Sequence, residues 1–160
     1  MLPPILKDDL SIPVVGAPLF IISNPDLVIA QCRAGIVGSF PSLNARPIEQ
    51  LDEWLTRINE ELAAHKAQFP EKKTAPFAVN LIVHGSNDRL MEDIKLVVKH
   101  KVPIVITSLG AVPEVNSAIQ SYGGITLHDI TNQKHAHSAI NKGATGLIAV
   151  AAGAGGHAGK

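Results

Sequence analysis

The sequence predicts an α/β fold with a parallel sheet, and three observations support this prediction. Short β-branched runs alternate with amphipathic stretches at a spacing of about 25 residues, which is typical of successive βα units. The apolar residues are mostly valine, isoleucine, leucine and alanine, as strands covered on both faces require. Glycines and polar residues gather where the predicted strands end, at the edge where parallel sheets hold their sites.

Six runs have the length and composition of strands, and a helix is expected after each of the first five. The predicted strands cover residues 13–17, 35–40, 77–83, 102–107, 124–128 and 146–150. The predicted helices cover residues 25–33, 88–100, 112–121 and 132–142, and a longest one that starts over 44–47, has apolar residues at helical spacing over 48–62 and is broken at 70–76. Ser23 or Asn24 is expected to cap the first helix, with Pro25 at its first position and Gly35 beyond its end.

Two architectures accommodate these units: an open doubly wound sheet, or a TIM (β/α)8 barrel of which roughly the first six βα units are present. A barrel brings all its strand ends to one mouth, whereas an open sheet spreads them along a line. A complete barrel typically needs about 250 residues. If the chain forms a barrel, residues 1–160 are a single barrel domain that is truncated at its C-terminus, as a fragment or a cleaved product.

Composition argues against several classes of partner. The 14 basic residues balance the 14 acidic ones, so we expect no binding to nucleic acid or to an anionic membrane surface. No run of about 18 apolar residues is present, and we expect no membrane span. Cys32 is the only cysteine, so no internal disulfide is possible, which fits a reducing, cytoplasmic location. The histidines lack the spacing of metal ligands, and we expect no metal site.

The most informative segment is a glycine-rich run, residues 153–156, followed by His157. Its pattern matches G-x-G-x-x-A, but it follows the sixth predicted strand instead of the first, and the position about 20 residues later, where an acidic residue is expected, lies beyond residue 160. Glycines let a backbone approach a ligand closely, so His157 is expected within reach of whatever binds there. Asn80, inside an apolar strand, either faces a ligand or hydrogen-bonds in the core. Asp129 is either a helix cap or a site residue.

Taken together, five segments resemble the nitronate monooxygenase family, formerly called 2-nitropropane dioxygenase, a family of flavin-dependent (β/α)8 barrels. The segment over 143–159 is the most specific of them, and that over 15–19 is moderately specific. The others cover 78–81, 106–110 and 128–130.

The resemblance implies a cofactor and a set of site residues. FMN is expected across the C-terminal mouth of the barrel, and His157 matches the catalytic base of the family. Asp129 stands near the flavin at a position where some relatives carry lysine. The matching cofactor-binding positions are Ala17, Pro18 and Leu19 along the flavin ring, Asn80 near it, and Ala154, Gly155 and Gly156 in the turn that approaches it.

The resemblance also implies a reaction: FMN-dependent oxidation of alkyl nitronates or nitroalkanes by O₂ to a carbonyl compound and nitrite. The expected partners are thus small molecules, and association of the chain with copies of itself is left open. Two alternatives remain. One is an FMN-dependent NAD(P)H:quinone or enoyl-acyl-carrier-protein reductase of the same barrel type. The other is an inactive fragment, because glycine-containing loops after the last two strands hold the FMN phosphate in this family.

Overall fold

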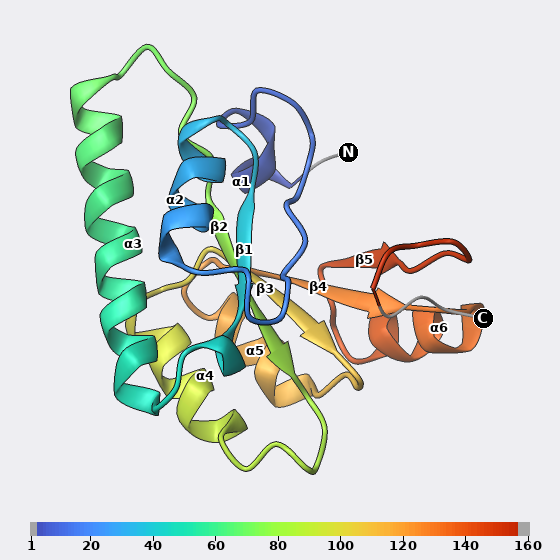
Figure 1. Cartoon of the computed structure of the whole chain (residues 1–160). Helices are drawn as coiled ribbons and strands as arrows, with labels where there is room; N and C mark the ends of the chain where they lie inside the picture. The colour runs from blue at the N-terminus through green and yellow to red at the C-terminus, as the bar shows by residue number, and fades with distance from the viewer. Residues whose placement is uncertain (1–2, 157–160) are drawn as a thin grey trace.

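The computed structural model describes residues 3–156, and its centre is one parallel sheet of five strands (Figure 1). Neighbours in the sheet are also neighbours in the sequence, in the order β1-β2-β3-β4-β5. The strands are β1 (Gly38–Pro41), β2 (Phe77–Ile82), β3 (Ile104–Ser108), β4 (Ile125–Ile130) and β5 (Gly146–Ala149).

Helices connect the strands and leave their carboxyl ends at one edge of the sheet (Figure 1). Short helix α1 precedes the sheet, and the 3₁₀ helix η1 follows β1. The α-helices are α1 (Pro4–Lys7), α2 (Pro25–Arg33), α3 (Ile48–Gln68), α4 (Leu90–Lys99), α5 (Pro113–Gln120) and α6 (Gln133–Asn141), and η1 spans Ser42–Asn44.

The two faces of the sheet have separate apolar cores. On one face, β1 to β3 pack against α2 to α5, with Phe40, Leu55 and Val105 among the buried side chains. On the other face lies a smaller cluster that includes Ile106 and Leu6 of α1. We call the face covered by α2 to α5 the helix-facing side and the opposite face the inner face. Successive strand residues point to opposite faces, so each polar residue near a strand end lies on one or the other.

The strand order decides between the two predicted architectures. A doubly wound sheet reverses its strand order and carries helices on both faces, whereas this sheet adds each new strand on the same side. Helices α2 to α5 all pack on one face, as they do around a barrel. The chain therefore has the α/β architecture of part of a TIM (β/α)8-type barrel.

The prediction of a strand over residues 13–17 is wrong in extent. The segment makes a single parallel bridge, Val15 to Val37, beside the start of β1. The N–H of Gly16 donates to Val37 O at 2.7 Å, and the N–H of Val37 donates to Val14 O at 3.0 Å. Pro13 and Pro18 flank the bridge and have no N–H to extend it, so the described sheet has five strands and this bridge.

The other predicted elements differ from the structure mainly at their ends. Helix α3 begins at Ile48, just after the predicted start over residues 44–47, and ends at Gln68, before the predicted break at residues 70–76. Asn24 is the cap of α2, since its Oδ1 accepts from the N–H of Leu27 at 3.1 Å. Within residues 3–156, no helix is both long enough and apolar enough to cross a membrane.

Candidate functional site

The first part of the candidate site is a hydrogen-bonded pair at the carboxyl ends of β2 and β3. Asn80 is only 6% exposed, and its Nδ2 donates to Ser108 Oγ at 2.8 Å and to Ile106 O at 3.1 Å. Strand alternation places Asn80 and Ser108 on the inner face, together with Ile106. No hydrogen bond among the described residues uses Asn80 Oδ1. The amide is thus fixed in the core by its nitrogen, with its oxygen left for another donor.

The second part is the loop over residues 17–23, which Asn44 of η1 holds in place. Asn44 Nδ2 donates to the backbone oxygens of Leu19 and Ser23, each at 2.9 Å, and Asn44 Oδ1 accepts from the N–H of Ile21 at 3.2 Å. Ser23 Oγ accepts from the N–H of Leu19 at 2.9 Å. These bonds fix the loop beside the end of β1.

This loop presents an unusual run of exposed apolar side chains. Ile21 is 76% exposed and has a φ of 69°, which is strained for a β-branched residue. The four exposed residues of the run are Leu19, Phe20, Ile21 and Ile22. Ala17 and Pro18, the other predicted flavin contacts of this segment, lie immediately before it. The loop therefore forms an apolar wall next to the sheet edge.

Asp129 occupies the inner face at the end of β4, where it is half-buried. Its register partner on β5 is Ile148, and Ile148 packs against the inner apolar cluster. Asp129 is not the cap of α6, because Asn132 has that role and accepts from the N–H of His135 at 2.9 Å. The helix-cap interpretation of Asp129 is therefore wrong.

The glycine-rich segment after β5 is exposed. Gly153 and Gly156 have positive φ values of 86° and 68°, which favour glycine. A Cβ placed on Gly153, Gly155 or Gly156 would meet no atom within 4 Å, so the described backbone borders open space. Ala154 closes a turn through its N–H, which donates to Ala151 O at 3.1 Å. His157, the predicted base, lies outside the described residues.

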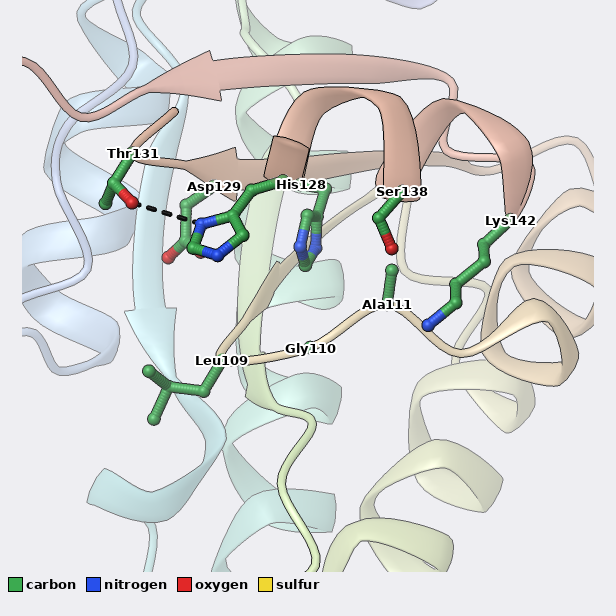
Figure 2. A pocket seen from close by; sticks show the side chains of 9 residues that line it. Leu109, Gly110, Ala111, His128, Asp129, Thr131, Ser138 and Lys142 are labelled. Carbon is green, nitrogen blue, oxygen red and sulfur yellow. Dashed lines mark hydrogen bonds between the residues drawn. The ribbon is translucent and has the colours of Figure 1, made fainter. Parts of the chain in front are cut away.

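A cavity of about 460 Å³ lies beside these strand ends, between the loop after β3 and helix α6 (Figure 2). Its walls are Leu109, Gly110, Ala111, His128, Asp129, Thr131, His135, Ser138 and Lys142. His128 is 5% exposed, and its Nδ1 lies 2.7 Å from Thr107 Oγ1. Burial lowers the pKa of His128, and the nearby Asp129 carboxylate partly opposes that effect.

Sequence reasoning did not select His128 as a site residue. The relevant signal was present, because Thr107 and His128 are polar residues at the carboxyl ends of two predicted strands. Their register pairing joins them on the helix-facing side of the sheet. Within residues 3–156, no three histidine, cysteine, aspartate or glutamate side chains gather in a way that could hold a metal ion.

Comparisons with known proteins identify the fold. No family model matches the sequence, and no curated protein matches it. The structure is similar to that of a single-site mutant of FabK from Thermotoga maritima, with a TM-score of 0.76, 20% identity, and coverage of 98% of this chain and 48% of that one. Another structure of the same FabK gives a TM-score of 0.72 at 20% identity, with coverage of 91% and 42%.

A nitroalkane oxidase from Streptomyces ansochromogenes is similar to the same extent, with a TM-score of 0.75, 20% identity, and coverage of 91% of this chain and 48% of that one. The chain thus spans about half the length of these solved structures. At this level of identity the likeness shows a shared α/β barrel architecture.

Proposed function

We propose that the chain is the N-terminal part of an FMN-dependent enzyme that oxidises alkyl nitronates or nitroalkanes by O₂, releasing a carbonyl compound and nitrite. The observation that carries the proposal is the meeting of Asn80, Ser108 and Asp129 on the inner face at the carboxyl ends of β2 to β4. A barrel places its reactive groups at this edge. The sequence resemblance to nitronate monooxygenases and the similarity in fold to a nitroalkane oxidase support the same reaction.

The described residues fit a planar, partly apolar cofactor. The loop over residues 17–23 offers exposed apolar side chains, and the glycines after β5 border open space where a backbone can approach a ligand. Asn80 Oδ1 has no donor among the described residues and can accept from an N–H of a flavin ring. Leu19, Asn80 and the turn over residues 154–156 would therefore hold the FMN ring.

In the proposed reaction the protein residues would transfer the proton and position the ring, while the electrons would pass to the cofactor. When bound, FMN supplies the electron acceptor for oxidation of the nitronate. A nitroalkane carries an acidic C–H next to its nitro group, and a neutral imidazole at His157 would take that proton. Leu19 and its apolar neighbours would exclude water from the mouth, and Asn80 would orient the ring through its amide oxygen.

The direct test is His157→Ala, made in this chain or in any longer polypeptide to which mass spectrometry shows that it belongs. A general base contributes about 10²–10⁴-fold, so nitroalkane turnover should fall by that factor while flavin absorbance is retained. A preformed nitronate should be affected less, because its proton is already gone. His137→Ala, on exposed helix α6, is the matched control. Unchanged nitroalkane turnover in His157→Ala would exclude the assigned role.

The reductase alternative predicts a different pattern of substrate use. Steady-state NADH consumption with a quinone or an enoyl thioester, without turnover of nitronate, would select it. The inactive-fragment alternative predicts a mass near 16.9 kDa and no flavin absorbance after incubation with FMN. Oxygen uptake that depends on nitronate excludes both.

A further inference from the structure

We propose that the cavity between the loop after β3 and helix α6 is an oxyanion-binding site, separate from the inner face where the flavin is expected. The ligand class is a phosphate or another small tetrahedral oxyanion. Figure 2 shows His128, Ser138 and Lys142 directed toward this space from β4 and α6, with Gly110 and Ala111 on the opposite wall. The inference does not depend on the proposed flavin chemistry.

The central group is His128, which the flavin mechanism does not use. Its side chain is on the helix-facing side of β4, whereas Asp129 is on the inner face. Nδ1 is held by Thr107 at 2.7 Å, and no hydrogen bond among the described residues uses Nε2. When the Thr107 hydroxyl donates to Nδ1, the ring proton is on Nε2 and can be donated to a bound oxygen. In that tautomer the buried imidazole offers a preformed N–H donor to the cavity.

The loop over residues 109–111 supplies backbone donors on the other wall. The N–H groups of Gly110 and Ala111 have no acceptor among the described residues. A Cβ on Gly110 would approach Val83 O to 2.6 Å, so glycine is required for the loop to pass this close to the end of β2. The loop leads into α5, whose first residue is Pro113 and whose N-terminus has no side-chain cap. Pro113 has no N–H, and the N–H of Val115 donates to Val112 O at 3.1 Å. The donors on this wall are therefore the N–H groups of Gly110 and Ala111.

The side chains of α6 favour an anion over a cation. His135 and Ser138 of α6 border the cavity, together with Thr131 before the helix and Lys142 at its C-terminal cap. Lys142 brings a positive charge, and Ser138 brings a hydroxyl that can donate. Burial is the main cause that lowers the pKa of His128; Asp129 opposes it, and His135 and Lys142 lower the pKa further, so the charges of all three act on the ring. Asp129 is the single carboxylate among the cavity residues, against the two histidines, the lysine and the serine of the same lining.

Two other cavities of the described structure lack this combination. The groove between α3 and α4 is lined by Glu49, Asp52, Glu53 and Glu92 together with Lys95, and it presents mostly acceptors. The groove near Asp9 and Lys66 holds a single surface ion pair of 3.5 Å, with both side chains about half exposed. A buried histidine that borders open space, with a lysine and free backbone N–H groups around it, occurs only at the α6 cavity within the described residues.

The test is a titration of the ¹⁵N-labelled 160-residue chain with inorganic phosphate, with ionic strength held constant by sodium chloride. We expect saturable shifts of the Gly110 and Ala111 amides and of the His128 ring nitrogens, with a proton on Nε2. Lys142→Gln should raise the phosphate Kd by about tenfold, which is the worth of one charge-assisted hydrogen bond. Lys134→Gln, on the same helix but outside the cavity wall, should leave Kd within about twofold of wild type.

A second variant and a second ligand pair complete the experiment. Ser138→Ala is at an exposed position, so it should fold normally and weaken phosphate binding less than Lys142→Gln does. If the natural source is the phosphate of a cofactor, FMN shifts the same amides and riboflavin does not; if it is free phosphate, FMN leaves them unshifted. The absence of a saturable shift, or equal weakening in Lys142→Gln and Lys134→Gln, overturns the proposal.

Discussion

The two ends of the sheet differ in how completely they are buried. All residues of β1 and β3 are buried, whereas β5 alternates between half-buried and exposed residues. Helix α3 buries four leucine and isoleucine side chains, but Ala139 is the one buried residue of α6. Two apolar residues of the β5–α6 end, Ile140 and Leu147, are 56% and 39% exposed. The same βα unit is thus repeated with very different amounts of packing.

The difference in burial indicates that one end of the sheet contributes most of the stability and the other end contributes the binding sites. Burial of apolar surface is the main favourable contribution to folding, so β1 to β3 with α2 to α4 should carry most of the free energy of unfolding. The β4–α6 end has open space instead, and both the oxyanion cavity and the glycine-rich segment lie there. Regions that bind ligands are commonly drawn from the less stable parts of a fold.

The largest effect should come from removing a core side chain at the packed end. Leu55 is fully buried, so Leu55→Ala should lower the free energy of unfolding by about 2–5 kcal/mol. Ile140→Ala removes an exposed side chain at the other end and should change it by less than about 0.5 kcal/mol. Urea unfolding of both variants measures the contrast. Equal decreases in the free energy of unfolding would show that the two ends of the sheet contribute equally to stability.

A smaller effect is expected from a buried charge that joins α4 to the segment after β1. Asp93 is fully buried and accepts from Ser42 Oγ at 2.7 Å and from Arg89 Nη2 at 2.9 Å. Asp93→Asn keeps the shape but removes the charge, and should cost about 2 kcal/mol. Glu92→Gln, at the adjacent exposed position, is the control for a general charge effect. A loss no greater than that of the control would exclude Asp93 from the stabilising network.

The smallest expected effect is on the pH dependence of stability, and it comes from His128 at the less buried β4–α6 end. Burial lowers the pKa of His128 below its ordinary value of 6.5, so the unfolded chain binds more protons near that pH. The contribution of His128 to stability is complete above pH 6.5 and declines as the pH falls toward its folded pKa. His128→Gln should therefore flatten the pH dependence of urea unfolding in phosphate-free buffer, and His137→Gln should not. Parallel profiles for wild type and His128→Gln would contradict a buried, neutral imidazole.

Much of the fold follows from local signals in the sequence. Asn24 as one of the two predicted caps, Pro25 at the helix start and Gly35 beyond the helix end are all confirmed, because each depends on the conformation of a few neighbouring residues. The prediction of a full strand over residues 13–17 was wrong because the length of a strand depends on hydrogen bonds to its neighbour. Local β propensity carries no information about that neighbour.

The site was predictable only in part, for a related reason. Asn80 was identifiable as a polar residue in an apolar strand, and the structure gives it Ser108 as a partner. The role of His128 depends on which face of β4 it occupies and on its register with Thr107, and both are tertiary properties. Asp129 was ambiguous because a cap and a site residue look alike until Asn132 is seen to cap α6.

The three hydrogen bonds that Asn44 makes to the loop over residues 17–23 have a consequence for the thermodynamics of ligand capture. Because folding has already set the backbone of this apolar wall, a ligand that contacts it loses little affinity to ordering the loop. Association should then proceed in one step, close to rigid-body docking, with discrimination between ligands residing in their dissociation rates.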